Sequence, residues 1–525
     1  MSSTRLASTA FLAPSALYAD FLSRFGRVAG FYDYAPCEAD SYRRAAAAID
    51  YPAGRRAALA AALERRNGPS PALEALSRPG TVVVTTGQQV GLFSGPAYTI
   101  YKALTAAKLA RRLTELGIAA VAVFWLATED HDFEEVCSAW VFDHEQRPAQ
   151  IAVPCAHSGP RVAGRIPVQG EPAAALAGAL GELPYAGEVA RMAAAAYQEG
   201  RTLGEAFAAL LGSLLGRYNL LLLDPLDAAI RELAAPLVAQ AVDAAPDLLA
   251  ALLRRNQELA AAGYHAQVHV EAGQAPFFLL DGDSRLALRR EGGHYVSKQA
   301  RYTVAELRAR AERLSPSALL RPVVADYLMP TAASVVGPAE TAYMAQSQVL
   351  YHALLGRMPV LVPRAGFTIL DGRAAKLLAR YGLTLDEVLA GQEALAAAIA
   401  ARLVPRELEQ SLDAAESETR SALETLRSAL KAFDPTLAAA LDNSRARMLY
   451  QLAKIRRKTA RECARRHERS ALETAYLSNL IYPQRRLQER FYSILPFLAR
   501  HGLDFVDRLY ENVEVDFPDH RILTA

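Results

Sequence analysis

The chain has 525 residues and an almost balanced charge, with 58 lysines and arginines against 56 aspartates and glutamates. This length predicts more than one hydrophobic core, and the balanced charge excludes a global basic field for nucleic acid and an acidic tail. The four cysteines (Cys37, Cys137, Cys155 and Cys463) lack Cys-x-x-Cys spacing, so they indicate neither a disulfide framework nor a zinc cage.

The first 80 residues combine aromatic side chains with alanine-rich helical stretches. We expect them to form a helical arm that packs on the first sheet. No segment near the N-terminus has the features of a signal peptide, and no apolar run of about 18 residues is visible. We therefore expect a cytoplasmic protein that does not bind a membrane.

A β-branched run from Thr81 to Thr86 predicts a buried strand. A loop with glycines at 87, 91 and 95 follows, and a helix begins at Gly95-Pro96, since proline suits the first helical position. Tyr98 and Lys102 share one face of its first turns. The positive end of this helix points at the glycine-rich turn, which favours an anion site.

The glycines of this loop have a second interpretation, in which they only permit tight turns. Their spacing matches neither the P-loop nor the dinucleotide fingerprint. The pattern therefore predicts a strand–loop–helix site and leaves its ligand open.

A second apolar run, Ala119 to Ala127, predicts a parallel neighbour of the first strand, joined to it by a right-handed crossover. It leads into the acidic segment Thr128-Glu129-Asp130-His131-Asp132-Phe133-Glu134-Glu135. Because ligands bind beyond the carboxyl ends of parallel strands, both segments should face one crevice.

Part of the acidic segment has a structural explanation, because Asp132 and Glu135 resemble a capping box for the next helix. Glu129, Asp130 and His131 are not explained in this way. They could act as a general acid or base, hold Mg²⁺, orient a substrate amine, or form loop hydrogen bonds only. Helical His-x-x-x-His spacing is absent, which disfavours a zinc hydrolase.

The middle of the chain predicts two insertions into the sheet, at about residues 140–215 and 226–315. Between them, Leu220 to Leu223 reads as a further strand, and residues 226–262 read as a helix. Tyr264 to Val270 and Pro276 to Leu280 predict a hairpin with Gly273 in its turn. His265 and His269 would then be ordinary half-exposed strand residues.

The segment Thr331 to Tyr343 has the same pattern as the first site, a strand followed by a Gly-Pro pair that begins a helix. Val335-Val336 predicts a short strand, and Gly337-Pro338 predicts a helix start with Glu340 and Tyr343 in its first turns. Two such starts suggest facing helix N-termini across one cleft. Runs from Pro359 to Pro363 and from Phe367 to Leu370 are expected to complete the sheet.

Residues 372–482 have a different character. From Leu408 to Phe433, apolar residues recur at alternating steps of four and three, which is typical of a coiled coil. Asp434-Pro435 predicts a reversal into a second, antiparallel helix, and the exposed apolar surface favours self-association. A basic run between Lys454 and Arg461 lacks interleaved aromatic residues, so it indicates a solvated face and not a nucleic-acid site. Residues 483–525 are expected to be helical and to return to the core, which spans residues 1–371.

Six segments together resemble the cysteine ligase family of bacillithiol biosynthesis, in order and over nearly the whole chain. They are Thr86-Gly87-Gln88-Gln89, Gly95-Pro96-x-Tyr98-Thr99, Glu129 to Glu135, Leu320-Arg321-Pro322-Val323-Val324, Gly337-Pro338-Ala339-Glu340 and Tyr482-Pro483-Gln484. The resemblance implies an α/β fold: a Rossmann-like core with inserted connecting segments, similar to class I aminoacyl-tRNA synthetases. It also implies a C-terminal coiled coil that makes a homodimer.

The reaction implied by the resemblance joins L-cysteine to the amine of glucosaminyl malate. Activation of the cysteine carboxylate by ATP, with or without Mg²⁺, would give an acyl phosphate or an adenylate. Asp130 or His131 would take the proton of the attacking amine, and Lys102 would offset negative charge. The expected binding residues are Thr86, Gly87, Gln88, Gln89, Gly95, Tyr98, Glu129, Asp132, Arg321, Gly337, Glu340 and Tyr343.

Two alternatives from other classes remain open at this point. The first is a non-catalytic nucleotide-binding scaffold that dimerises through its coiled coil. The second is a metal-dependent hydrolase that uses the acidic segment. Substitution of Asp130 or His131 separates the ligase from the scaffold, because only the ligase would lose its product.

Overall fold

The computed structural model describes residues 3–6, 15–154, 161–516 and 519–525, so Cys155 lies outside the described residues. The chain divides into two compact units. The sheet unit comprises the chain up to Thr368 together with Glu489–Leu523, and the hairpin unit comprises Ile369–Gln488.

The sheet unit is built on a five-stranded sheet in the order β13-β12-β2-β3-β6. All of these neighbouring strands pair in parallel, which confirms the predicted α/β class. The strand that comes first along the chain lies at the centre, and later strands are added on either side of it, as in Rossmann folds. The bounds are Val82–Gln89 (β2), Ala120–Ala127 (β3), Leu220–Leu223 (β6), Thr331–Val336 (β12) and Val360–Pro363 (β13).

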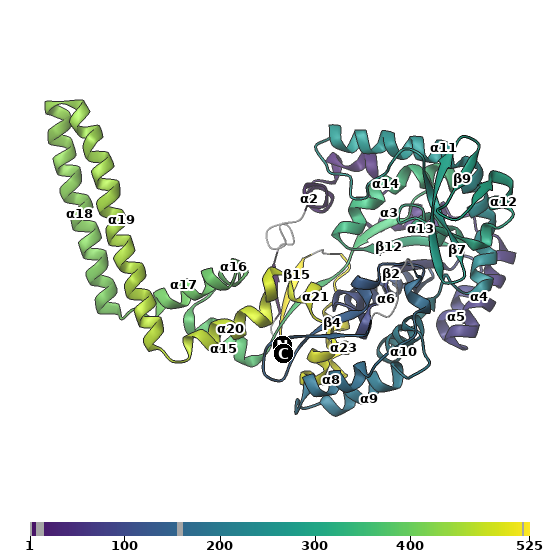
Figure 1. Ribbon diagram of the computed structural model, residues 1–525, viewed down its shortest axis with the longest axis horizontal. Helices are drawn as coiled ribbons and strands as arrows, with labels where there is room; N and C mark the ends of the chain where they lie inside the picture. Colours follow the sequence, from purple (N-terminus) through teal and green to yellow (C-terminus); the bar gives the residue numbers. More distant parts are fainter. Residues whose placement is uncertain (1–2, 7–14, 155–160, 517–518) are drawn as a thin grey trace. The chain divides into compact units, whose positions relative to one another are not determined.

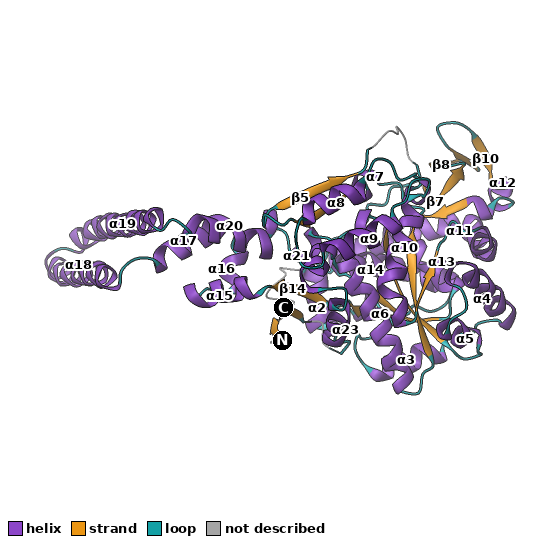
Figure 2. Ribbon diagram, turned by 90° about the horizontal axis from the view of Figure 1, so that it is seen from below, coloured by secondary structure: helices purple, strands orange, loops and turns teal. Residues whose placement is uncertain are grey.

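Helices cover both faces of this sheet (Figure 2). On one face, Val83, Val121 and Val123 belong to a core cluster that also contains Phe21 and Leu59 from the N-terminal helices. The predicted packing of the N-terminal arm on the sheet is therefore confirmed. On the other face, α6 (Tyr98–Glu115) packs along β2 and β3. The helices of the arm are Ala16–Ser23 (α2), Ala39–Ala47 (α3), Ala53–Asn67 (α4) and Pro71–Ser77 (α5).

The segment between β3 and β6 forms a small insertion. In its described residues, one helical turn, α7 (Phe133–Val136), comes first, an antiparallel pair of strands follows, and three longer α-helices complete it. Thr202 caps the last of these helices in a capping box with Glu205. The bounds are Ser138–Phe142 (β4), Pro148–Ala152 (β5), Pro172–Leu180 (α8), Ala186–Ala196 (α9) and Leu203–Leu215 (α10).

A second, antiparallel sheet follows in the order β10-β9-β8-β7-β11. The predicted hairpin of Tyr264–Val270 with Pro276–Leu280 is wrong, because the first of these segments is not a strand. The Gln346 side chain bonds both the N–H and the C=O of Val268, at 2.9 Å each, and so replaces a strand partner. The bounds are Gln274–Asp281 (β7), Ser284–Glu291 (β8), His294–Val296 (β9), Arg301–Thr303 (β10) and Leu314–Pro316 (β11).

The helix between the two sheets, α11 (Ala228–Ala261), is long and apolar enough to cross a membrane by length and composition alone. Its apolar face instead lies in the core of the sheet unit, where Leu237, Ala241, Leu248 and Leu252 are at most 3% exposed. This burial identifies α11 as a core helix.

Two predictions about the end of the sheet unit need correction. Gly366–Leu370 (β14) does not complete the main sheet but belongs to a separate three-stranded sheet with β1 (Ser3–Leu6) and β15 (His520–Thr524). The Glu489 carboxylate accepts the N–H of Phe367 at 3.0 Å and so takes a donor that a sheet neighbour would use. The C-terminal segment is helical over Leu495–His501 (α22) and Phe505–Asn512 (α23) but ends in a strand.

The hairpin unit contains two long antiparallel helices, α18 (Arg406–Phe433) and α19 (Pro435–Arg466), which lie side by side (Figure 1). Asp434 caps α19 by accepting the N–H of Thr436 at 2.8 Å, so the predicted reversal is confirmed. Exposed ion pairs such as Arg427–Asp442 link the two helices. The other helices of this unit are Gly372–Tyr381 (α15), Leu385–Leu389 (α16), Gln392–Arg402 (α17) and Ser470–Ile481 (α20).

Candidate functional site

The strand order of the main sheet reverses between β2 and β12. β3 lies on one side of β2, and β12 lies on the other. The helices that follow these strands, α6 and α14 (Pro338–Leu354), therefore lie on opposite faces and leave a crevice between the strand ends. Ligands of open parallel sheets bind in such a crevice.

A cavity of about 380 Å³ lies at this reversal point. Its walls come from the ends of β2 and β12, the first turn of α14 and one face of α13 (Arg321–Leu328). The predicted site residues that line it are Thr86, Gly87, Gln88, Gln89, Tyr98, Lys102, Asp130, Arg321, Gly337, Glu340 and Tyr343. Those that do not line it are Gly95, Glu129, His131 and Asp132. The first turn of α14 is therefore part of the wall, whereas the glycine before α6 is not.

Gly87 can only be glycine in this packing. It pairs with Trp125 of β3, and a Cβ on Gly87 would lie 2.8 Å from the Trp125 carbonyl oxygen and 3.0 Å from the Trp125 Cβ. A side chain would push the two strands apart at the cavity wall. Beside it, the Thr86 hydroxyl donates to the Val335 carbonyl at 3.0 Å and ties β2 to β12.

Gln88 and Gln89, which were expected in the loop, are the last two residues of β2 and connect neighbouring elements. Gln88 Nε2 donates to the Tyr98 hydroxyl at 3.1 Å. Gln89 Nε2 donates to Asp130 Oδ2 at 3.3 Å and thus joins the end of β2 to the segment after β3. Both glutamine side chains are engaged within the protein.

Lys102 is almost fully buried, and its ammonium group has three partners. Nζ donates to the Gly87 carbonyl at 2.6 Å, to Gln88 Oε1 at 3.0 Å and to Glu340 Oε1 at 2.8 Å. An ammonium group has three N–H bonds, so all its donors are used. Burial lowers the pKa of Lys102, and the Glu340 carboxylate opposes this shift. The structure therefore places Lys102 as a support that joins β2 to α14, because Glu340 also accepts the Gly337 N–H at 2.7 Å.

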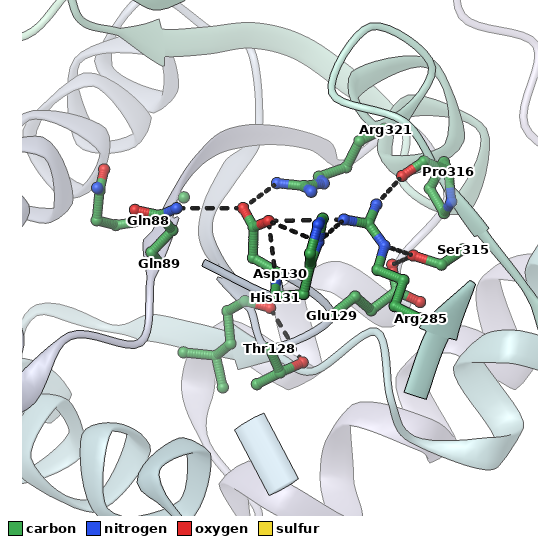
Figure 3. Close-up of polar contacts among 12 residues, drawn as sticks. Gln88, Gln89, Thr128, Glu129, Asp130, His131, Arg285, Ser315, Pro316 and Arg321 are labelled. Carbon is green, nitrogen blue, oxygen red and sulfur yellow. Dashed lines mark hydrogen bonds and ion pairs between the residues drawn. The ribbon is translucent and has the colours of Figure 1, made fainter. Parts of the chain in front are cut away.

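Asp130 lies between the Gln89 amide on one side and two guanidinium groups on the other (Figure 3). Arg321 Nη1 lies 3.5 Å from Oδ2, and Arg285 Nη1 lies 3.6 Å from Oδ1. Burial alone would raise the pKa of Asp130, but the two arginines hold it below its usual range. The carboxylate is thus ionised and fixed in orientation at neutral pH.

The His131 ring contacts the same guanidinium, with Nδ1 at 3.1 Å from Arg285 Nη1. A guanidinium only donates hydrogen bonds, so Nδ1 accepts, and in the neutral ring the proton lies on Nε2. Burial and the Arg285 charge lower the pKa of His131 below its ordinary value. His131 is therefore neutral at pH 7, with Nε2–H as a donor.

Three other predicted residues support the loops around the cavity. Glu129 is buried, and its carboxylate accepts hydrogen bonds from Arg231 and from the Ser315 hydroxyl. Asp132 caps α7 (Phe133–Val136) by accepting the Glu135 N–H at 3.4 Å, as predicted. Gly95 has a φ of 65° and ends the short turn before α6.

The structure also brings in residues that sequence reasoning missed. Arg364, Arg490 and Asp326 line the cavity, and Arg285 fixes Asp130 and His131. Arg490 follows Tyr482-Pro483-Gln484, one of the six segments that resemble the family. This nearby segment was the sequence feature that could have indicated Arg490 as a site residue. Asp326 lies on α13, the helix that begins at Arg321, and both side chains line the cavity.

The carboxylates around the cavity do not assemble a cation site. In the parts of the chain that the structure describes, no three His, Cys, Asp or Glu side chains form a group that could hold a metal ion. Asp130 is instead held by arginine and glutamine donors.

Comparison with known proteins gives matches along the whole chain. Residues 1–365 match the family model described as "Bacillithiol biosynthesis BshC, N-terminal Rossmann-like domain", and residues 367–525 match "Bacillithiol biosynthesis BshC, C-terminal coiled-coil domain". A protein of Solibacter usitatus called "Putative cysteine ligase BshC" is 51% identical over 97% of each chain. Proteins of the same name from Koribacter versatilis (34% identical over 97% of each chain) and Salinibacter ruber (30% identical over 97% of this chain and 96% of the relative) are also similar.

Proposed function

The chain belongs to the BshC family of cysteine ligases in bacillithiol biosynthesis, and from this premise we propose that it joins L-cysteine to the amine of glucosaminyl malate. The family membership expected from the six sequence segments is confirmed. The product of the proposed reaction is bacillithiol, in which a new amide bond links the cysteine carbonyl to the sugar nitrogen.

The observation that carries this proposal is the position of Asp130. It lies at the point where the strand order reverses, in the wall of the cavity, and two guanidinium groups keep it ionised. An oriented carboxylate is suited to accept a hydrogen bond from an amine. We assign Asp130 the role of holding the attacking amine and accepting its proton.

His131 has a supporting role, because it does not line the cavity. Its ring accepts a hydrogen bond from Arg285, and the same guanidinium contacts the Asp130 carboxylate. We therefore assign His131 the role of positioning Arg285 and Asp130, and Asp130 the role of acceptor.

Amide formation from a free carboxylate requires activation, and we propose ATP as the co-substrate. Phosphoryl transfer and adenylyl transfer both provide a leaving group for the attacking amine. Mg²⁺ commonly binds through one or two carboxylates and the substrate phosphates, so it would arrive with ATP and not in a cage made by the protein. ATP and free cysteine are both available in the cytoplasm, which we propose as the location.

The proposed binding residues fall into two groups: those that would contact the ligand and those that support the cavity wall. Gly87 and the first turn of α14 bring backbone close to the ligand, and Arg321 offers a cation beside Asp130. Lys102 and Glu340 hold β2 and α14 in register. Thr86, Gln88, Gln89, Tyr98 and Tyr343 complete the wall.

The test is ATP consumption by the purified protein in the presence and absence of cysteine and glucosaminyl malate. We expect consumption to require both, with bacillithiol as the product. Asp130→Asn should lower kcat by roughly 100-fold or more, whereas the neighbouring Asp132→Asn, which removes a carboxylate outside the cavity, should leave kcat nearly unchanged. Indifference of ATP consumption to both substrates would remove the assignment, as would full activity of Asp130→Asn.

We also propose a homodimer formed through the hairpin unit. Several large apolar side chains on α18 and α19 are exposed, including Phe433 at 84%, Leu426, Leu437, Met448 and Ile455. Exposed apolar surface of this kind is typical of an interaction site. Light scattering of the wild type and of a double variant, Met448→Glu with Ile455→Glu, tests the proposal: a dimer is expected for the first and a monomer for the second.

A further inference from the structure

Four cationic side chains line the cavity, and three of them have partners within the protein. Lys102 uses its three N–H bonds as described above. Arg364 is buried and forms a two-point pair with Glu489, at 2.6 and 3.0 Å. Arg321 contacts the Asp130 carboxylate. Their charges are largely balanced before any substrate arrives.

Arg490 is different. Among the residues that the structure describes, no hydrogen bond or ion pair engages its guanidinium group, although the side chain lines the cavity. The residue is also exposed to solvent, which places its charge at the mouth of the cavity. Arg490 is thus the cationic side chain of the wall that remains available to a ligand.

The backbone that carries Arg490 is held firmly on both sides. The preceding residue, Glu489, is buried and accepts hydrogen bonds from Arg364 and from the Phe367 N–H. The following residues, Phe491 and Tyr492, are buried, and the Tyr492 carbonyl accepts the Ala97 N–H at 2.7 Å. A side chain on an anchored backbone loses less freedom when it binds, which favours its use in recognition.

The charge of Arg490 also acts on groups inside the cavity. It adds to the burial that lowers the pKa of Lys102. It opposes the burial that raises the pKa of Tyr98. The guanidinium therefore contributes to a positive potential where a negatively charged ligand would enter.

We infer that Arg490 determines acceptor specificity by binding a carboxylate of the malyl group of glucosaminyl malate. This inference rests on the proposed function, because it names the part of the acceptor that is recognised. The cysteine carboxylate loses its charge on activation, whereas the malyl carboxylates stay charged throughout. A permanently charged arginine at the mouth suits a group that is bound equally well before and during the reaction.

The first experiment compares Arg490→Gln with a matched control, Arg508→Gln. Arg508 lies on α23 in the same unit, where it forms an exposed pair with Asp504. Arg490 would bind the acceptor equally well in the substrate complex and in the transition state. Its loss should therefore raise the KM for glucosaminyl malate roughly 10- to 100-fold with little change in kcat. The KM values for cysteine and ATP should stay within about twofold, and Arg508→Gln should behave as the wild type.

The second experiment uses acceptors with and without the malyl carboxylates, namely glucosaminyl malate and methyl glucosaminide. The wild type should prefer the acid strongly, whereas Arg490→Gln should discriminate little between them. Arg490→Lys should recover part of the preference, because an ammonium group keeps the charge but not the two-point geometry.

Binding calorimetry separates this inference from the proposed function. Glucosaminyl malate is titrated into the protein without cysteine or ATP, so the readout does not require turnover. Weaker binding by Arg490→Gln supports the inference. Unchanged binding and KM for glucosaminyl malate in an active Arg490→Gln variant overturn it and leave the ligase function intact. A rise in the KM for cysteine or ATP alone assigns Arg490 to a different anion and also overturns it. A wild type that neither binds nor ligates the acceptor overturns the proposed function itself.

Discussion

The two units of the chain use ion pairs in contrasting ways. In the sheet unit, Lys102–Glu340 and Arg364–Glu489 have side chains that are 2% and 23% exposed in the first pair and 6% and 1% in the second. In the hairpin unit, Arg427–Asp442 joins α18 to α19 with side chains that are 35% and 44% exposed. The residue types are alike, and only their contact with water differs.

This difference determines what each pair contributes. An exposed pair gives up little hydration and is weakened by salt, so it adds little to stability. A buried pair has lost the hydration of both charges, so removing one partner leaves an uncompensated charge in the interior. The buried pairs lie around the cavity, where they hold β2, α14 and the segment after β13 in position.

The largest effect is expected for Glu489→Gln. This change keeps the shape of the side chain but leaves the buried Arg364 guanidinium without its counter-charge. The free energy of unfolding should fall by about 3–5 kcal/mol, as measured by urea denaturation. Glu511→Gln, an exposed change of the same type on α23, should have no comparable effect. Equal stabilities of the two variants would contradict the contrast between buried and exposed pairs.

The next effect concerns Asp326, a buried carboxyl group that forms no ion pair with another described residue. Burial raises the pKa of Asp326 to about 6, while the Tyr351 hydroxyl donates to its Oδ2 at 2.5 Å. The folded state thus binds this proton more tightly than the unfolded state, so stability is lost as the pH rises from about 4 to 6. The loss at pH 7 is at most about 3 kcal/mol.

Asp326→Asn keeps the acceptor for Tyr351 and removes the ionisation. The variant should therefore be more stable than the wild type at pH 7, by up to about 3 kcal/mol, with the difference vanishing near pH 4. Unfolding curves at pH 4, 5, 6 and 7 measure this. A variant that is less stable at every pH would show that ionised Asp326 is stabilised by the groups around it.

A smaller effect is expected for Lys102→Met, because its partner Glu340 is partly exposed and can be hydrated. The Gly87 carbonyl and the Gln88 side chain would lose their donor, at a cost of about 1–3 kcal/mol in the free energy of unfolding. Ligase activity should fall together with stability, since β2 and α14 form the cavity wall. Lys108→Met, on the same helix but outside the cavity, is the control and should keep its activity.

The smallest effect is expected for Arg427→Gln in the hairpin unit. Its ion pair with Asp442 is open to solvent, so the midpoint of urea unfolding should not change measurably. Salt titration of the wild type provides a second check, because added salt should weaken this pair and leave the buried pairs unaffected. A large destabilisation by Arg427→Gln would mean that the exposed ion pairs of the hairpin contribute as much stability as the buried pairs around the cavity.

Much of the fold was predictable because its signals are local. The apolar runs at Thr81–Thr86 and Ala119–Ala127 overlap β2 and β3, and α14 begins at Pro338 with Gly337 as its N-cap. The reversal at Asp434 follows from a capping side chain and a proline next to it. The segment from Tyr264 to Val270 was mispredicted because Gln346, 78 residues from Val268, satisfies its backbone.

By itself, the sequence determined the strands β2, β3 and β6, the start of α14, the reversal of the long hairpin and part of the set of residues that line the cavity. These follow from backbone conformations and periodicities of neighbouring residues. Only the tertiary structure decided which charged groups are paired and which are available. Glu129 is held by Arg231, 102 residues away, whereas Asp130 lines the cavity and Arg490 forms no ion pair with another described residue. Whether a charged side chain forms an ion pair depends on its distance from other charges in the folded protein and on its burial. The local sequence does not show which of two neighbouring acidic residues will be paired.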